Sequence, residues 1–212
     1  MRVLAVGAHP DDIELGCGAT LALYKARGHR VDMLVLTEGE ASSNPAVNKK
    51  CCEKSARILG ADHLFFGNLK DTRIDDGSET ISIIEHLLTK SDSEIIFTHS
   101  TKDKHQDHRN TGLASLSAAR RSRAILLYES PTALREFVPQ VFVDVGSTFP
   151  KKMTALRMFG FRTGPLCYHN HRRKHVQSAI EGLARYRGFQ SETELAEAFE
   201  VGRLLLSINR GS

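Results

Sequence analysis

The sequence predicts a three-layer α/β sandwich with a mostly parallel central sheet. Short apolar runs alternate along the chain with longer segments whose apolar residues recur at helical spacing. Several of the short runs are apolar almost throughout, which is typical of parallel strands covered by helices on both faces. This alternation favours right-handed βαβ units. A length of 212 residues fits one domain spanning 1–212.

Six short apolar segments are predicted to form strands, and the first of them is expected to be central in the sheet. In chain order they are Arg2–Ala8, Val31–Thr37, Asp62–Phe66, Glu94–Thr98, Ala124–Tyr128 and Gln140–Val145. The helical periodicity falls between these strands, in Gly18–Arg27, Asn48–Leu59, Glu79–Lys90, Gln106–Arg120 and Ser147–Met158. The resulting order is that of a Rossmann-like sandwich.

Three segments rich in turn-forming residues are predicted to be loops, and a basic helix is predicted near the end of the chain. The loops are Glu38–Val47, Gly67–Gly77 and Phe161–Asn170, and the basic helix covers roughly His171–Arg187. If the sheet has its carboxyl edge near these loops, they would form the walls of a pocket there.

The composition limits the classes of function. Hydrophobic residues make up 41% of the chain and charged residues 25%, as in ordinary globular proteins. The net charge of +4 is too small and dispersed to indicate nucleic acid, although it mildly favours an anionic small substrate. No apolar run approaches the roughly 20 residues that a membrane helix needs. The four cysteines form no CxxC pair, so we expect reduced thiols in a cytoplasmic protein.

The first predicted strand runs into His9, Pro10, Asp11 and Asp12, where a glycine-rich phosphate loop would otherwise lie. The stretch VGAHPDDIELGCG does not match GxGxxG. A tight turn, fixed in part by Pro10, can direct the side chains of His9 and Asp12 to one point. The simpler alternative is a polar turn that caps the first helix.

A second cluster of polar residues follows the predicted strand Glu94–Thr98. His105 and His108 are three residues apart, so at the start of a helix they share a face. If this strand lies beside the first one, His108 meets His9 and Asp12. Two imidazoles and one carboxylate leave a coordination place for water, as in a catalytic zinc site. Taken alone, the two histidines also fit a solvated helix start.

This ordered pair of motifs, HPDD and then HxDH, resembles the PIG-L/LmbE family of zinc-dependent N-deacetylases. Members of that family remove acetyl groups from N-acetylglucosamine-type sugars and glycoconjugates. Three further stretches are similar to the family: TEGE (Thr37–Glu40), ARILGA (Ala56–Ala61) and AEAFEV (Ala196–Val201). The similarity therefore extends over nearly the whole chain.

The resemblance implies a role for each residue of the two motifs. His9, Asp12 and His108 are implied to be the metal ligands, and Asp11 the general base that activates the metal-bound water. His105 is implied to stabilise the oxyanion and to protonate the leaving amine, and Asp107 to orient a histidine. Zinc is the first choice of metal, although such a site also accepts Fe²⁺, Co²⁺ or Mn²⁺.

The substrate is less closely defined. Asp71 corresponds to a family aspartate that faces the sugar, and Arg73 lies beside it; a salt-bridged surface turn is the alternative. Where many relatives carry an arginine near the second helix, this chain has Lys49 and Lys50, and Lys50 is predicted to contact substrate.

Two remaining features near these motifs receive simpler interpretations. His169, His171 and His175 fit a basic, solvated helix start better than a second metal site, although they could still line the pocket. Cys17 is expected to pack in the core, because a fourth protein ligand would close the metal site.

The predicted function is metal-dependent removal of an N-acetyl group from a glucosamine-like sugar, a small-molecule partner. Two other classes stay open: a non-catalytic metal- or sugar-binding protein, and a nucleotide-binding Rossmann-like module. The missing GxGxxG weighs against the second. Asp11 and His105, which a purely structural metal site does not need, weigh against the first. Relatives often form oligomers, so a homo-oligomer is possible.

Overall fold

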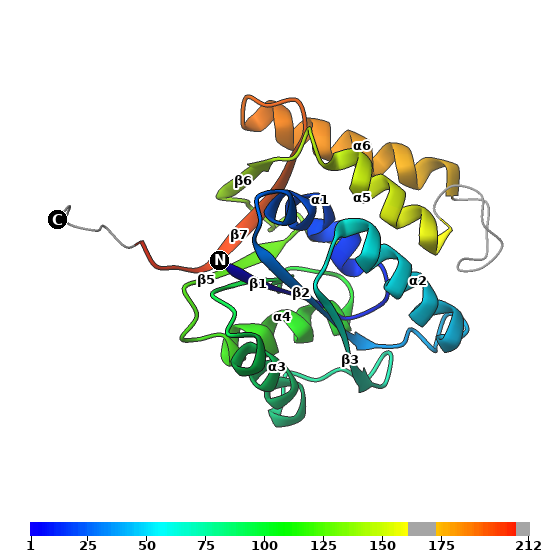
Figure 1. The fold of residues 1–212 in the computed structure, drawn as a ribbon, viewed down its shortest axis with the longest axis vertical. Helices are drawn as coiled ribbons and strands as arrows, with labels where there is room; N and C mark the ends of the chain where they lie inside the picture. Colours follow the sequence, from blue (N-terminus) through cyan, green and yellow to red (C-terminus); the bar gives the residue numbers. More distant parts are fainter. Residues whose placement is uncertain (161–172, 207–212) are drawn as a thin grey trace.

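The computed structural model describes residues 1–160 and 173–206 and contains a seven-stranded sheet. The strands are β1 (Arg2–Gly7), β2 (Arg30–Thr37), β3 (His63–Leu69), β4 (Ile95–His99), β5 (Ala124–Tyr128), β6 (Val141–Asp144) and β7 (Ala196–Leu204). Their order across the sheet is β3-β2-β1-β4-β5-β7-β6 (Figure 1). The first five are mutually parallel, so the mostly parallel sheet is confirmed.

The strand order reverses between β1 and β4. These two strands pair directly and in parallel, with Val3 opposite Ile95 and Ala5 opposite Phe97. The chain continues outward from β1 through β2 to β3, and outward from β4 to β5. Ligands of open α/β sheets bind at such a reversal, outside the carboxyl ends of the strands. The predicted proximity of the first and fourth strands is therefore confirmed.

Helices cover both faces of the sheet (Figure 1). One face carries α1 (Asp12–Ala26), α2 (Pro45–Leu59), α5 (Phe149–Leu156) and α6 (Arg173–Gln190), and the other carries α3 (Ser78–Ser91) and α4 (Gln106–Ala118). A 3₁₀ turn, Arg157–Phe159, extends α5. Local sequence explains the ends of α2, because the Asn44 side chain caps its first turn and Gly60 adopts the left-handed conformation that ends it.

The core lies in layers on the two faces of the sheet. Alternate residues of β1 illustrate this, because Val3 and Ala5 pack toward α1 and α2 whereas Leu4 and Val6 pack toward α3 and α4. All four side chains are fully buried. A smaller cluster joins α5, α6 and the start of β7. These layers establish the predicted three-layer Rossmann-like sandwich.

The structure corrects two predicted elements. The first helix begins at Asp12 rather than Gly18, so the HPDD motif leads directly into it. A strand that was not predicted, β7, pairs antiparallel with both β5 and β6. The predicted loop Phe161–Asn170 lies outside the described residues, as do His169 and His171, and the side chain of His175 is not described either.

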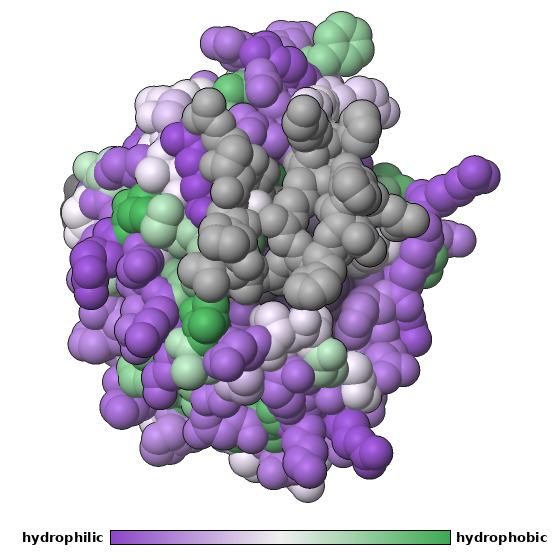
Figure 2. Space-filling view, turned by 90° about the vertical axis from the view of Figure 1, so that its right-hand side faces the viewer, coloured by the Kyte–Doolittle hydropathy of each residue, from purple (hydrophilic) through white to green (hydrophobic). Residues whose placement is uncertain are grey.

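On the face of the molecule shown in Figure 2, the surface formed by the described residues is mostly polar. Hydrophobic residues are scattered there among hydrophilic ones. Among the helices that the structure describes, none combines the length and the apolar character needed to cross a membrane.

Candidate metal centre

The two predicted motifs meet at the carboxyl edge of the sheet. The first follows β1, where the backbone N–H of His9 donates to Asp12 Oδ2 at 2.7 Å and closes a tight turn. The second follows β4 and enters α4, whose first turn contains Asp107 and His108. Although these segments are almost a hundred residues apart in sequence, the pairing of β1 with β4 places them side by side.

Asp12 lies between the two predicted histidine ligands. His9 Nδ1 is 3.2 Å from Asp12 Oδ2, and His108 Nε2 is 3.3 Å from Asp12 Oδ1. The three side chains are nearly buried, with exposures of 15%, 7% and 8% for His9, Asp12 and His108. Two ligand atoms that each lie about 2.1 Å from a tetrahedral zinc ion are about 3.4 Å apart. Each of these two separations has the length expected for a pair of ligands on one ion.

Among the described residues, three sets of side chains in this cluster have possible ligand atoms that all lie within 4.8 Å of one another, and none of these sets contains both His9 and Asp12. These sets are His9–His105–His108, Asp12–His99–His108 and His9–Asp71–Asp107. His9 and Asp12 fall in different sets, and His108 links the first two. The described residues thus offer a plausible metal-binding group, with His108 common to two arrangements.

The outer nitrogen of His9 is held by two aspartates. His9 Nε2 lies 3.0 Å from Asp107 Oδ2 and 3.1 Å from Asp71 Oδ1. Burial alone would lower the pKa of His9, but its bonds to Asp107, Asp12 and Asp71 outweigh burial and raise that pKa to about 12. A histidine surrounded by carboxylates in this way stabilises positive charge, and a metal cation can take the place of the proton.

His108 has a corresponding outer partner in Asp103, which the sequence analysis did not identify. Asp103 Oδ2 is 3.1 Å from His108 Nδ1, so His108 Nε2 is left to face Asp12. Asp103 also accepts hydrogen bonds from the His105 backbone N–H and from the hydroxyls of Ser130 and Thr132. Burial would lower the pKa of His108, but Asp12 and Asp103 raise it to about 9.

His99, at the end of β4, is a second residue that the sequence analysis missed. Its fully buried ring stacks on His108 with 4.0 Å between ring centroids. His99 Nε2 is 3.1 Å from Asp12 Oδ2 and 3.2 Å from the backbone N of Ala8, while its Nδ1 has no hydrogen-bond partner. Burial, followed by the charge of His108, lowers the pKa of His99 to about 4, so this ring is neutral.

Asp11 is the residue before the first turn of α1, but it does not act as a helix cap. Its backbone has φ 92°, in the left-handed region, and its side chain makes no capping hydrogen bond. Such strain in a residue other than glycine is often found at functional sites. Burial, then the charges of Asp12 and Glu14, raise the pKa of Asp11 well above its usual value. The capping interpretation of this motif is therefore wrong for Asp11.

His105 lies at the start of α4 and packs against both histidines of the trio. Its ring centroid is 4.8 Å from that of His9 and 4.6 Å from that of His108. The backbone N–H of Asp107 donates to His105 Nδ1 at 3.2 Å, which places the ring proton on Nε2. Burial, then the charge of His108, lowers the pKa of His105. It is therefore a neutral hydrogen-bond donor.

The residues predicted to bind substrate lie in different settings. The Asp71 carboxylate accepts from the backbone N–H of Ala41 and contacts His9, so it supports the cluster directly. Arg73 and Lys50 are both exposed, the first just after β3 and the second on α2. Cys17 is fully buried in the core beside β1, as predicted.

Fold and cluster together define a Rossmann-like α/β protein with a candidate metal centre at a reversal of strand order. The PIG-L family, described as GlcNAc-PI de-N-acetylase, matches residues 4–119, which include every residue of the cluster. The chain is also 37% identical over 163 residues to the uncharacterized deacetylase YaiS of Escherichia coli K12, a match covering 73% of this chain and 88% of YaiS. The chain belongs to the PIG-L/LmbE deacetylase family.

Two solved structures share the fold. The N,N'-diacetylchitobiose deacetylase of Pyrococcus horikoshii is 20% identical with a TM-score of 0.83, over 94% of this chain and 83% of that chain. GalB, the 4-carboxy-2-hydroxymuconate hydratase of Pseudomonas putida KT2440, is 19% identical with a TM-score of 0.82 over the full length of both chains. Proteins with this fold therefore catalyse more than one reaction. The function of this chain has to be inferred from the residues of its site.

Proposed function

We propose that this protein is a zinc-dependent N-deacetylase that releases acetate from the 2-amino group of a glucosamine-like sugar or glycoconjugate. Family membership indicates a deacetylase acting on such compounds. The observation that supports the zinc-dependent mechanism is the convergence of His9, Asp12 and His108, with Asp12 lying 3.2 Å from His9 and 3.3 Å from His108. The outer nitrogens of both histidines are also held by carboxylates, as is usual for metal ligands.

In this proposal His9 and His108 would hold the ion through ring nitrogens and Asp12 through its carboxylate. When bound, zinc supplies a Lewis acid that polarises the amide carbonyl and acidifies water. Fe²⁺, Co²⁺ and Mn²⁺ also fit two imidazoles and one carboxylate.

Asp11 takes the proton of the attacking water as the new C–O bond forms. Its carboxylate is buried, makes no capping bond and has a raised pKa, all of which favour a base. His105 Nε2–H would donate a hydrogen bond to the oxygen that becomes negative, and the proton that Asp11 has taken from the water would pass to the leaving nitrogen. The C–N bond breaks, and the products are acetate and the free amine.

Substrate contacts by Asp71, Arg73 and Lys50 remain predictions within this proposal. Asp71 already contacts His9, so we expect its substitution to change metal binding as well as the Michaelis constant. Arg73 and Lys50 are exposed, so we expect their substitution to change the Michaelis constant alone.

The proposal is tested by incubating zinc-reconstituted protein with N-acetylglucosamine, N,N'-diacetylchitobiose and inositol-linked N-acetylglucosamine, and measuring amine and acetate. Equal amounts of both products are expected from at least one compound. A hydratase like GalB would release neither, and a non-catalytic binding protein would bind without turnover. Calorimetric binding of a dinucleotide would instead favour the nucleotide-binding alternative.

The matched variant is Asp11→Asn, which keeps the size of the side chain but removes the base. We expect a fall in kcat of roughly 10²–10⁴-fold, because positioned bases contribute about that much. Zinc content should stay at the wild-type level, since Asp11 is not one of the proposed ligands. Near-normal turnover would exclude Asp11 as the base, and lost zinc would reassign it as a ligand.

A further inference from the structure

The stretch AEAFEV forms the first part of β7 and contributes two buried glutamates, Glu197 and Glu200, each only 5% exposed. Glu197 lies opposite Val143 of β6, and Glu200 lies opposite Leu127 of β5. Neither belongs to the candidate metal centre. Buried carboxylates are costly unless they are fully paired, so their partners indicate what they do.

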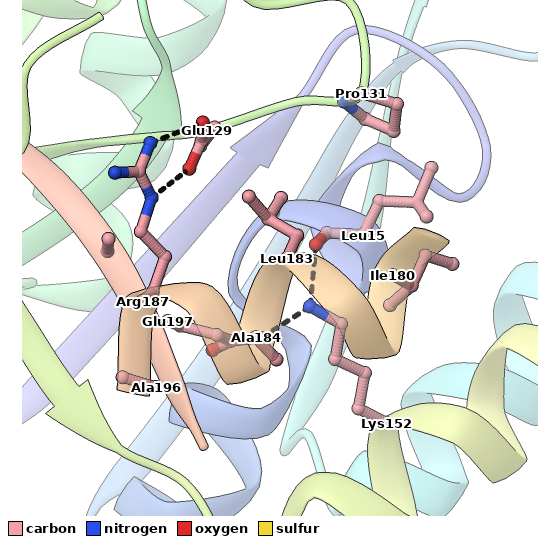
Figure 3. Close-up of a pocket in the computed structure, with 12 residues that line it drawn as sticks. Leu15, Glu129, Pro131, Lys152, Ile180, Leu183, Ala184, Arg187, Ala196 and Glu197 are labelled. Carbon is pink, nitrogen blue, oxygen red and sulfur yellow. Dashed lines mark hydrogen bonds and ion pairs between the residues drawn. The ribbon is translucent and has the colours of Figure 1, made fainter. Parts of the chain in front are cut away.

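Glu197 is bonded to the middle of α1. Its two carboxylate oxygens accept the backbone N–H groups of Ala19, at 3.1 Å, and Thr20, at 2.7 Å. Lys152 of α5 lies against it, with Nζ 2.7 Å from Glu197 Oε1 and 2.6 Å from the Leu15 carbonyl oxygen. Figure 3 shows Lys152 extended between Leu15 and Glu197.

These contacts fix the turn of α1 that follows Asp11 and Asp12. The Ala19 N–H and the Leu15 carbonyl are an i→i−4 pair of the helix. Both also bond to side chains outside α1, Ala19 to Glu197 and Leu15 to Lys152. Leu15 is joined to the site directly, because its backbone N–H donates to the Asp11 carbonyl at 2.9 Å. A shift of Glu197 or Lys152 is therefore transmitted through one helical turn to Asp11.

Glu200 holds the other segment of the site. Its carboxylate accepts from the Ser100 hydroxyl at 2.8 Å and from Lys102 Nζ at 2.6 Å. Ser100 follows His99, which contacts Asp12, and Lys102 precedes Asp103, which contacts His108. Glu200 also accepts the backbone N–H of Val138, which ties this loop to the segment before β6.

We infer that Glu197 and Glu200 are positioning residues: one strand, β7, sets the distance between the two segments that supply the metal ligands. The inference rests on the metal centre of the proposed function. It assigns no contact with substrate or metal to either glutamate.

The test compares the zinc affinity of Glu197→Gln and Glu200→Gln with that of the wild-type chain, by competition with a chromogenic chelator. Removing a residue that supports metal ligands typically weakens affinity by roughly 10–100-fold. We expect a loss of at least about tenfold in each variant. For the substrate that the wild type hydrolyses, we expect kcat to fall while KM stays within about twofold.

A matched control is Arg187→Gln. Arg187 of α6 forms a two-bond ion pair with Glu129 in the same cavity, and its side-chain hydrogen-bond partners, Glu129 and Gln190, belong neither to α1 nor to the loop after β4 (Figure 3). This variant leaves the partly buried charge of Glu129 unpaired, so it should also lose thermal stability. Its zinc affinity should stay within about twofold of the wild type.

A double variant separates an effect of Glu197 on stability from an effect on the position of the metal ligands. Lys152→Met combined with Glu197→Gln removes the unpaired lysine charge, so the melting temperature of the metal-free protein should recover. Zinc affinity should stay low, because a glutamine oxygen cannot accept both N–H groups of α1. If instead zinc affinity recovers with the melting temperature, Glu197 acts only on stability and the inference is wrong.

The remaining outcomes are also distinct. Folded Glu197→Gln and Glu200→Gln proteins with wild-type zinc affinity would overturn the inference, as would an equal loss in Arg187→Gln. If Glu197→Gln does not fold, Glu200→Gln still decides the question, because its partner Lys102 is 44% exposed and keeps contact with water. A wild-type chain that binds zinc but releases no acetate would contradict only the proposed function.

Discussion

At the scale of single residues, the site depends on carboxylates that do not belong to the proposed ligand set. Asp107 and Asp71 hold the outer nitrogen of His9, and Asp103 holds that of His108. Each such contact fixes the orientation of an imidazole and determines which nitrogen faces Asp12. Because these partners lie in two separate segments, one after β3 and one after β4, the orientation of the ligands is a property of the folded chain.

Asp103→Asn tests this dependence. An asparagine presents only one acceptor oxygen, whereas Asp103 accepts from His108, the His105 N–H and two hydroxyls. We expect zinc affinity to fall by roughly 10–100-fold, measured by chelator competition. Asp62→Asn is the control, because Asp62 also accepts a backbone N–H and pairs with a lysine, but at the start of β3. Equal affinities in the two variants would refute a supporting role for Asp103.

The residues of the candidate site were easier to predict from the sequence than the residues that support them. His9, Asp12, His105 and His108 were predictable because they stand in two short motifs at strand ends. Asp103 was not, because its contact with His108 spans a loop whose shape depends on Ser130 and Thr132. His99 was missed for another reason: it ends an apolar strand, and only the pairing of β1 with β4 brings it to Asp12.

At the scale of elements, α1 is placed by a close approach to β5. Gly16 faces the ring of Tyr128 so closely that a Cβ atom there would lie 2.1 Å from a ring carbon. Tyr128 is itself held, because its hydroxyl donates to the Val6 carbonyl at 2.9 Å. The helix that starts at Asp12 can therefore sit this close to the sheet only with glycine at position 16.

Gly16→Ala is expected to lower the free energy of unfolding by roughly 1–3 kcal/mol, because neither the helix nor the ring has room to move freely. Since α1 carries Asp11 and Asp12, turnover should fall as well. Gly18→Ala is the matched control in the same helix: a Cβ there meets its nearest atom at 3.6 Å, an ordinary contact. Urea unfolding of both variants measures the difference, and similar values would contradict the close-approach argument.

The start of α1 and the existence of β7 could not be predicted correctly from the sequence. The start of α1 was placed at Gly18 because HPDD reads as a turn, yet the left-handed conformation of Asp11 lets the helix begin at the next residue. The strand β7 was overlooked because Glu197 and Glu200 interrupt its apolar pattern. Both glutamates are buried and paired in the structure, which a pattern of hydrophobicity cannot indicate.

At the scale of the whole molecule, the site is a consequence of topology. The alternation of strands and helices predicts a parallel sheet, and the order of that sheet places the ends of β1 and β4 together. The five parallel strands and the covering helices were predictable because each has a local pattern. The strand β7 was not, and its antiparallel pairing with β5 and with β6, which was predicted as Gln140–Val145, depends on contacts between distant segments.

The most direct measurement of the central claim is the zinc content of zinc-loaded, gel-filtered protein, determined by elemental analysis for the wild type and for His108→Ala. His108 is the residue shared by two of the possible ligand sets and faces Asp12. Our account predicts about one zinc ion per wild-type chain, since one tetrahedral site fits the trio, and little or none in a folded His108→Ala variant. A wild-type chain that retains no divalent metal, or a variant that retains as much zinc as the wild type, would contradict it.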